Sequence, residues 1–307
     1  MNRPGKRAAD LAGAARKLGL GTVQFGMSYG VSNVTGKFPE SAVGPLLEYA
    51  WQEGVRTLDT ATAYGDSESV LGRNLNAAQS FAVVTKTVPL SAGELGSGEL
   101  DAVERGFRGS LERLGMPGVY GILVHNADNL LCPGGPALYE LLADWKRAGL
   151  VRKIGVSVYD GSQLRRLIDS FSLDLVQLPL NVFDQRLIAD GALRALKRLG
   201  VEVHARSVFL QGLLLMKADE LPPSMNKFAA RIAAYRRYLL EAGRSPLEAA
   251  LGFIKHLVDV DVALIGINSQ AQLQECIESY DRAAPLDLAR FASDEIDLID
   301  PRRWSSQ

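Results

Sequence analysis

Four residues of complementary chemistry occur in the first half of the chain, each at or just after the end of a short apolar run. Asp59 and Tyr64 lie in one segment, and Lys86 and His125 end two later runs. A lysine cation beside a phenol favours the phenolate, which lowers the pKa of a tyrosine from its ordinary value of about 10. Asp59 can hold the lysine in place, and an imidazole can donate a hydrogen bond to a substrate oxygen. Such a set protonates a carbonyl oxygen or deprotonates an alcohol, with Tyr64 as the general acid or base.

Each of these residues also has an ordinary structural interpretation when it is taken alone. Asp59 can cap a helix, Lys86 can be a solvated surface charge, and His125 and Tyr64 can be packing residues. A lysine in an apolar strand is costly to bury unless it is paired, so the joint arrangement favours the chemical interpretation. The sequence offers no nucleophile–base pair for acyl transfer. It also has no HxH, HExxH or CxxC spacing, so no metal site is predicted.

Short β-branched runs alternate with helical patterns along the chain, which is typical of a parallel sheet with crossover helices. Eight strands are expected, near residues 17–25, 56–61, 81–88, 119–126, 151–158, 175–181, 201–208 and 263–268. Helical patterns lie between them, among them residues 40–53, 99–114, 136–148, 187–199 and 269–280. Several of these patterns are followed by a glycine, the residue that most readily takes the left-handed conformation at a helix end.

Eight strand–helix units fit a closed (β/α)₈ TIM barrel of the α/β class better than an open doubly wound sheet. No linker or change of composition divides the chain. We therefore predict a single barrel domain over residues 16–307, preceded by a flexible N-terminal arm over residues 1–15. In such a barrel the active site lies at the carboxyl ends of the strands, and Asp59, Tyr64, Lys86 and His125 all fall at that end.

The composition is that of an ordinary soluble protein, with 307 residues, 47% of them hydrophobic, and a net charge of −1. A nearly neutral chain offers no basic field for nucleic acid or an anionic membrane surface, and no apolar run reaches the roughly 18 residues of a membrane span. Cys132 and Cys276 are expected as free thiols in a reducing compartment. We therefore expect a cytoplasmic protein, monomeric by default.

Taken together, these residues resemble the aldo-keto reductase superfamily. The resemblance rests on the segment Asp59-Thr-Ala-Thr-Ala-Tyr64-Gly-Asp-Ser-Glu68, with Lys86 and His125 downstream, and covers residues 18 to 278. It implies hydride transfer between NADP(H) or NAD(H) and a small-molecule carbonyl compound or sugar. Tyr64 would be the proton donor, Lys86 and Asp59 would tune its pKa, and His125 would orient the carbonyl.

The same resemblance implies a cofactor that lies extended across the barrel mouth, and no GxGxxG follows any expected strand. Asp59, Ser157 and Gln177 would contact the nicotinamide end. The other residues implied at the cofactor are Gly21 and Thr22; Arg206, Ser207, Val208, Phe209, Leu210 and Gly212 along the nicotinamide face and the pyrophosphate; and Gly266, Asn268, Gln272 and Glu275 near the adenosine.

Three departures from the family pattern bear on the cofactor. Val158 follows Ser157 where many relatives carry asparagine, and Arg206 stands where many carry an aromatic residue, although its planar guanidinium can still stack on a ring. Residues 265–275 contain no lysine or arginine to hold a 2′-phosphate, and Glu275 would instead favour the 2′-hydroxyl of NAD. The family pattern favours NADP and this segment favours NAD, so both cofactors stay open.

Aromatic residues after the strand ends suggest the substrate. The candidate pocket consists of Phe25, Met27, Tyr29, Tyr64, Val88, Asn126, Tyr159 and Phe209. Such a pocket predicts an uncharged carbonyl compound or a sugar-like alcohol. The long segment between Gln211 and Phe228 is either a lid over the cofactor or a surface loop. Beside a carbonyl reductase, the alternatives are an NAD-dependent sugar dehydrogenase and a cofactor-binding, redox-sensing regulatory subunit.

Overall fold

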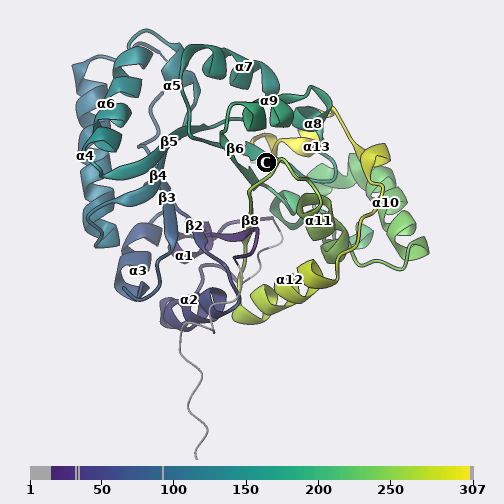
Figure 1. The fold of residues 1–307 in the computed structure, drawn as a ribbon. Helices are drawn as coiled ribbons and strands as arrows, with labels where there is room; N and C mark the ends of the chain where they lie inside the picture. The colour runs from purple at the N-terminus through teal and green to yellow at the C-terminus, as the bar shows by residue number, and fades with distance from the viewer. Residues whose placement is uncertain (1–14, 32, 34, 92, 305–307) are drawn as a thin grey trace, which may run out of the picture.

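Eight parallel strands close into a barrel in the computed structural model, which describes residues 15–31, 33, 35–91 and 93–304. The strands pair in chain order, and β1 pairs with β8 to close the barrel (Figure 1). The predicted TIM barrel and all eight expected strands are confirmed. Their bounds are β1 Leu18–Gly21, β2 Thr57–Asp59, β3 Ala82–Lys86, β4 Val119–Val124, β5 Val151–Ser157, β6 Leu175–Pro179, β7 Glu202–Arg206 and β8 Val262–Gly266. Residues 1–14 of the predicted arm lie outside the described residues.

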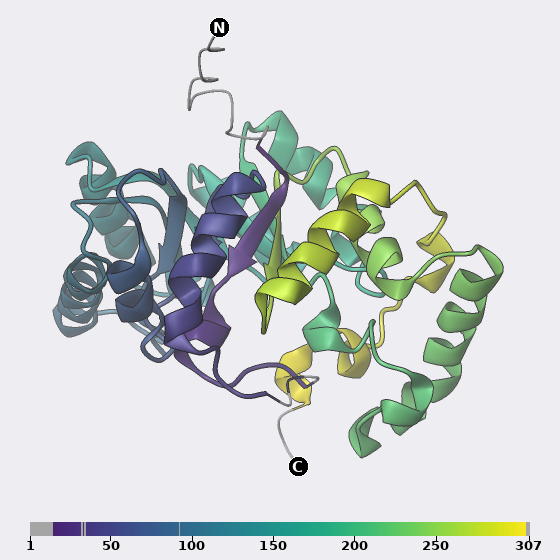
Figure 2. The same cartoon turned by 90° about the horizontal axis from the view of Figure 1, so that it is seen from below.

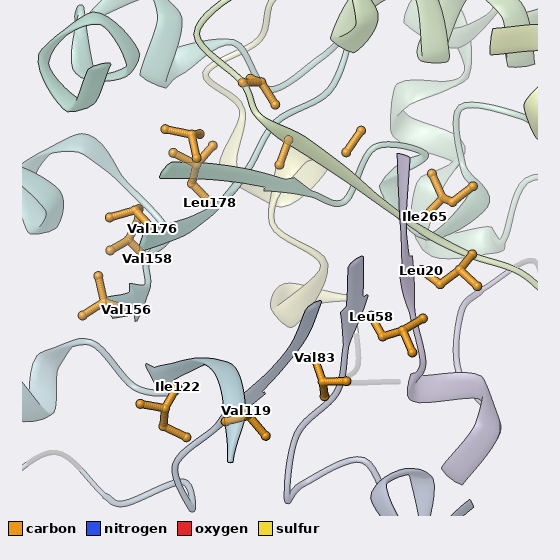
Figure 3. Packing of buried hydrophobic residues seen from close by; sticks show 14 of the residues in the cluster. Leu20, Leu58, Val83, Val119, Ile122, Val156, Val158, Val176, Leu178 and Ile265 are labelled. Carbon is orange, nitrogen blue, oxygen red and sulfur yellow. The ribbon is translucent and has the colours of Figure 1, made fainter. Parts of the chain in front are cut away.

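Alternation along the strands separates the packed core from the barrel interior. Leu20, Leu58 and Val83 belong to one buried cluster that joins the strands to the surrounding helices (Figure 3). Because successive side chains of a strand point to opposite faces, the residue after Leu58, Asp59, faces the interior. Lys86 of β3 does the same, and both line a cavity at the barrel mouth. Packing of the outward-facing apolar side chains against the helices thus fixes the positions of Asp59 and Lys86, which face the interior.

Helices form a ring around the barrel, as Figure 1 shows. The α-helices are α1 Val23–Gly26, α2 Val43–Gln52, α3 Ser67–Asn74, α4 Ser97–Leu114, α5 Asp128–Leu131, α6 Gly135–Arg147, α7 Gly161–Ser170, α8 Arg186–Ala189, α9 Ala192–Arg198, α10 Ala229–Glu241, α11 Pro246–Lys255, α12 Gln270–Arg282 and α13 Ile296–Ile299. The 3₁₀ turns are η2 Glu40–Ala42, η3 Leu210–Gly212, η4 Ala218–Glu220, η5 Pro223–Phe228, η6 Ala289–Phe291 and η7 Pro301–Arg303.

Two expected elements differ from the structure. The first strand ends at Gly21, and Phe25 lies in α1, where its ring packs on Phe38 with centroids 5.3 Å apart. The pattern expected as one helix over residues 187–199 is two helices, α8 and α9, because Gly191 between them has a φ of +77°. A left-handed residue ends one helix before the next can begin.

Two lysines fasten α11 and α12 at their carboxyl ends. Lys17 Nζ donates to the carbonyls of Ile254 at 3.1 Å and Leu257 at 2.5 Å, and Lys255 Nζ donates to the carbonyl of Tyr280 at 2.7 Å. A cation satisfies the carbonyls that a helix leaves unpaired at this end. The opposite ends of α11 and α12 reach the barrel mouth, so these contacts help to place them there.

A second buried cluster covers one side of the mouth. It joins the loop after β6 (Val182, Phe183), the segment after β7 (Leu210, Leu213), α10 (Tyr235) and the C-terminal turns (Leu298, Ile299). Figure 2 shows α10 standing outside the ring of helices on this side. The segment after β7 and the C-terminal helix α13 therefore pack together in one buried cluster.

Candidate active site

Lys86 and Asp59 form a buried ion pair at the carboxyl ends of β3 and β2. Lys86 Nζ donates to both carboxylate oxygens of Asp59, at 2.7 and 2.8 Å, and to the carbonyl of Thr60 at 2.9 Å. The two residues are 1% and 4% exposed. Burial acts to lower the pKa of Lys86, but the Asp59 carboxylate outweighs it and raises that pKa above its ordinary value. Lys86 therefore stays a cation.

Tyr64 lies against this pair, with the Lys86 ammonium 4.9 Å from the centroid of its ring. Burial raises the pKa of Tyr64, and Lys86 acts in the opposite direction without cancelling it. We expected Lys86 to bring the pKa of Tyr64 below its ordinary value, and the structure shows that desolvation prevails. The phenol is thus held in its protonated, proton-donating form at neutral pH.

His125 completes the group from the end of β4. Its ring lies perpendicular to that of Tyr64, at 89°, with centroids 6.3 Å apart. Burial and then the nearby Lys86 cation lower the pKa of His125 to about 4, so the imidazole is neutral at physiological pH. Its buried Nδ1 has no hydrogen-bond partner among the described residues. A neutral imidazole offers one N–H to a substrate oxygen.

The Asp59 carboxylate and backbone are fixed by neighbouring strands. Gln177 Nε2 of β6 donates to Asp59 Oδ1 at 2.7 Å. Thr22 Oγ1 donates to the Asp59 carbonyl at 2.9 Å and lies 2.8 Å from Ser67 Oγ. These contacts join the ends of β1, β2 and β6. They therefore fix the position of the Asp59–Lys86 ion pair relative to the cavity.

The loop that carries Tyr64 packs closely on the turn after β1. A Cβ atom at Gly26 would lie 1.7 Å from the Tyr64 carbonyl oxygen, so only glycine fits there. Gly65, next to Tyr64, has a φ of +57°, a conformation that glycine adopts at little cost. The two glycines allow the tyrosine backbone to approach the end of α1, and this contact sets where the phenol enters the cavity.

A cavity of about 720 Å³ opens at this face of the barrel. All four predicted catalytic residues line it: Asp59, Tyr64, Lys86 and His125. Most of the predicted cofactor residues also line it, namely Gly21, Ser157, Gln177, Arg206, Ser207, Val208, Phe209, Gly212, Gly266, Asn268, Gln272 and Glu275. The structure thus brings together residues from β1 to α12.

Several predicted residues lie elsewhere. Thr22 is fully buried beneath Asp59, and Leu210 belongs to the second buried cluster. Of the proposed substrate pocket, only Tyr29, Tyr64, Tyr159 and Phe209 line the cavity. The other four do not line it: Phe25 is in the core, Met27 is 41% exposed, Val88 packs towards Gly106 of α4, and the Asn126 amide caps the turn at Leu90 and Asp128.

Four groups of lining residues were not predicted as site residues. They are Val23, Gln24, Gly30 and Asn33 after β1; Gln211, Leu215, Met216 and Glu220 after β7; Ser245, Pro246 and Leu247 at the start of α11; and Leu264, Ile267 and Cys276 from β8 to α12. The length of the segment after β7 was a usable signal. The start of α11 carried another, since Ser245 and Glu248 form a capping box.

The segment after β7 combines unusual backbone with a contact across the cavity. Ser207, Leu210 and Gln211 have φ values of +59°, +49° and +52°, and they are the non-glycine residues in the left-handed region within the described part of the chain. Gln211 Nε2 donates to the Tyr29 hydroxyl at 3.1 Å. Because Tyr29 belongs to the loop after β1, this hydrogen bond joins two loops at the rim of the cavity.

Comparison with known proteins decides the family. A model of the aldo/keto reductase family matches residues 17–295. The chain belongs to this family. It is therefore an oxidoreductase that acts on small carbonyl substrates, and the family as a whole uses NAD(P)H. The resemblance inferred from the four polar residues is confirmed.

Among the curated relatives, a pyridoxal 4-dehydrogenase of Microbacterium luteolum is 26% identical, over 91% of this chain and 94% of the relative. A D-threo-aldose 1-dehydrogenase of a Pseudomonas species is 29% identical, over 73% and 80%. An aldo-keto reductase of Bacillus halodurans, solved in its holo form, matches with a TM-score of 0.70 at 17% identity, over 95% of this chain and 98% of that one. The solved structure supports the fold.

The unsatisfied polar atoms of the site fit a nicotinamide dinucleotide. Four buried side-chain atoms on cavity residues have no hydrogen-bond partner among the described residues: Gln24 Oε1, His125 Nδ1, Arg206 Nε and Asn268 Oδ1. Buried polar atoms normally find partners. These residues lie after β1, after β4, at the end of β7 and after β8, so the open hydrogen-bonding positions extend across the cavity.

Within the described residues, no helix is both long and apolar enough to cross a membrane. The same residues contain no group of three or more histidine, cysteine or acidic side chains placed to hold a metal ion.

Proposed function

We propose that this protein is an NAD-dependent dehydrogenase that oxidises a sugar, or a similar ring compound, at its aldehyde-level carbon. Tyr64 would be the general base in this direction and the general acid in the reverse one. The observation that carries the proposal is the position of the Tyr64 phenol, beside the buried Lys86–Asp59 pair and the neutral His125, in a cavity that the Glu275 carboxylate lines from α12.

The side chains of the site would carry out the proton transfers of this reaction. His125 donates a hydrogen bond to the reacting oxygen and holds it near the phenol. Tyr64 accepts the proton of the substrate hydroxyl as the carbon–oxygen double bond forms, and returns a proton in the reverse reaction. Lys86 favours the phenolate that the oxidation requires. The nicotinamide, when bound, accepts the hydride that leaves the carbon.

The charges around the cavity favour NAD over NADP. Of the described residues that line it, Lys86 and Arg206 carry positive charge, and both act on Tyr64. Glu275 is the charged lining residue contributed by α12, whereas Glu220 after β7 already pairs with Lys217 Nζ at 3.7 Å. A 2′-phosphate beside α12 would meet the Glu275 carboxylate rather than the cationic donors that usually bind it, whereas a ribose 2′-hydroxyl can donate to Glu275.

Two observations favour a sugar-like substrate. Three phenols, those of Tyr29, Tyr64 and Tyr159, line the cavity together with Phe209. Their rings and hydroxyls suit a ring compound that carries several hydroxyl groups. Two relatives are named as dehydrogenases of an aldose and of pyridoxal, D-threo-aldose 1-dehydrogenase and pyridoxal 4-dehydrogenase. Oxidation of a cyclic hemiacetal at its aldehyde-level carbon gives a lactone.

Cofactor choice can be tested without a substrate. Titration of the protein with NADH and NADPH, followed by nicotinamide fluorescence, should show tighter binding of NADH. Glu275→Arg should bring NADPH binding closer to that of NADH. Glu278→Arg, one turn further along α12 on an exposed side chain, is the matched control and should change neither. Tighter binding of NADPH by the unaltered protein would overturn the cofactor assignment.

The substrate class is tested with a panel of aldoses and ring aldehydes, each with NAD⁺ and NADP⁺. We expect NADH to form with at least one aldose, and we expect the lactone as the first product. If only open-chain ketones or aldehydes react, and only by reduction, the sugar dehydrogenase assignment is wrong.

Carbonyl reduction is a second candidate, and the raised pKa of Tyr64 favours it. A phenol that keeps its proton at neutral pH is already in the form that reduction requires. The same panel run with NADH would then show faster reduction than oxidation at neutral pH. Both candidates use the same side chains and differ in the direction that dominates.

A further inference from the structure

The C-terminal 3₁₀ turn η7 reaches the wall of the cavity through one ring. The guanidinium carbon of Arg302 lies 3.4 Å from the centroid of the Tyr159 ring, and that of Arg206 lies 4.1 Å from the same centroid. On one face of the ring the two groups would overlap at these distances, so they occupy opposite faces. Tyr159 is thus sandwiched between an arginine of β7 and an arginine near the chain end.

The outer arginine is firmly held. Asp300, which is 8% exposed, accepts hydrogen bonds from Arg302 at its backbone N–H (3.1 Å), at Nε (2.9 Å) and at its terminal nitrogen (2.5 Å). Bidentate arginine–carboxylate pairs fix the plane of the guanidinium as well as its position. The plane of Arg302 then fixes the tilt of the ring that stacks on it.

The inner arginine is held more weakly. Among the described residues, Arg206 donates to the Val158 carbonyl at 3.0 Å, its buried Nε has no partner, and its broad face rests on Tyr159. Arg206 and Tyr159 both line the cavity, whereas Arg302 does not. The position of Arg206 therefore depends on a ring whose other face is covered from outside the site.

We propose that Arg302 is a positioning residue, which acts through Tyr159 to hold Arg206 at the cavity wall and so sets the affinity for substrate. Arg302 lies beyond residues 17–295, the part that the family model matches, so the contact belongs to this chain's own C-terminal segment. The inference rests on the proposed function only in taking the Tyr159 side of the cavity as the substrate side.

The test compares three variants at adjacent positions. Arg302→Ala uncovers one face of Tyr159, and we expect KM for any substrate that the unaltered enzyme turns over to rise by about 2- to 5-fold, the range of a cation–π contact at an exposed site, because the Arg302 side chain is 56% exposed. The value of kcat should change much less, and the dissociation constant of NADH should rise together with KM, because Arg206 is also one of the predicted cofactor residues. Arg302→Lys keeps a cation over the ring and should recover part of the loss. Arg303→Ala is the matched control, because Arg303 is exposed and pairs with Asp297.

A double variant separates positioning from a merely structural role. In a Tyr159→Ala background, Arg302→Ala should cause no further rise in KM, because the ring that transmits its effect is gone. If Arg302→Ala lowers the melting temperature but leaves KM unchanged, or raises KM equally with and without Tyr159, the proposal is wrong.

A further measurement needs neither substrate nor cofactor. The ring signals of Tyr159, labelled with ¹³C and assigned with Tyr159→Phe, should shift in Arg302→Ala and stay in place in Arg303→Ala. If the Tyr159 signals do not shift in Arg302→Ala, the proposed role of Arg302 is wrong. If no aldose is oxidised in the substrate panel, only the proposed function is wrong.

Discussion

The two ends of the barrel carry the same four kinds of residue in different arrangements. At the mouth stand Asp59, Lys86, Tyr64 and His125, and near the opposite end stand Glu202, Lys153, Tyr120 and His204. At the opposite end, which we call the floor cluster, one carboxylate serves all three partners. Tyr120 Oη donates to Glu202 at 2.7 Å, His204 Nε2 lies 2.6 Å from Glu202, and Lys153 pairs with the same side chain.

The two groups differ in the hydrogen-bond partners of the carboxylate and in the surroundings of the tyrosine hydroxyl. At the mouth, Asp59 is occupied by Lys86 and Gln177, and Tyr64 lines the large cavity. In the floor cluster, Glu202 accepts a hydrogen bond from the hydroxyl of Tyr120, and none of the four residues lines that cavity. Similar residue types thus leave the phenol of Tyr64 facing a cavity at one end and tie the phenol of Tyr120 into an ion cluster at the other.

The largest expected effect separates the two tyrosines. Tyr64→Phe should reduce turnover by about 10²- to 10⁴-fold, the contribution of general acid–base catalysis, and should leave NADH binding nearly unchanged. Tyr120→Phe, the matched control, should keep its activity and lose about 1 kcal/mol of unfolding free energy with its hydrogen bond. Steady-state kinetics and urea unfolding measure both. If Tyr64→Phe retains most of the activity on every substrate, the assignment of the phenol is wrong.

The two lysines should differ in stability as well as in activity. Lys86→Met leaves Asp59 buried without its cation, which costs about 3–5 kcal/mol, and it should also abolish turnover. Lys153→Met should cost less, because the Lys153 side chain is 30% exposed and Glu202 keeps two other partners. Equal losses in the two variants would contradict the comparison.

The rates of oxidation and reduction should depend differently on pH, because Tyr64 and His125 at the barrel mouth have shifted pKa values. Because burial raises the pKa of Tyr64, the rate of oxidation should increase as pH rises above neutrality, and the rate of reduction should fall only at high pH. The His125 pKa of about 4 keeps the imidazole neutral above pH 5 or so. A pH profile of kcat/KM in both directions tests this, and an oxidation rate that falls from pH 7 to 9 would contradict it.

The smallest expected effect concerns the floor cluster. Burial acts to raise the pKa of Glu202, but hydrogen bonds from His204, Lys153 and Tyr120 outweigh it and lower the pKa from 4.5 to about 2. A carboxyl group with a lowered pKa stabilises the fold fully above its unfolded value, and this stability is lost as pH falls through the window from 4.5 to 2. Glu202→Gln should therefore flatten the loss of stability in this window. An unchanged slope in acid unfolding would show that the cluster contributes little.

The sequence was sufficient to predict the barrel and the meeting of the four polar residues at its mouth. Apolar runs, helix-ending glycines and strand ends place Asp59, Lys86 and His125 on one face without any knowledge of contacts. The pocket was harder to predict, since position after a strand does not determine where a side chain points. Val88 and Asn126 follow strands β3 and β4, yet one packs outward on α4 and the other caps a turn.

Contacts between distant segments could not be predicted either. The sandwich of Tyr159 depends on Arg302, 143 positions later in the sequence. The sign of the Tyr64 pKa shift also depends on burial, because the same lysine that favours the phenolate lies in a site that desolvates it. Residue types indicate which interactions can occur, and only the packing decides which one prevails.

The left-handed backbone of Ser207, Leu210 and Gln211 has a consequence for the design of more stable variants. An L-residue in this conformation costs roughly 1–2 kcal/mol that glycine does not, so replacement of Ser207 by glycine should raise the melting temperature. Three of the five residues from Ser207 to Gln211 are non-glycine residues in this unfavourable conformation. A variant selected for heat resistance alone would be expected to acquire glycine here, and to loosen the rim where Gln211 meets Tyr29.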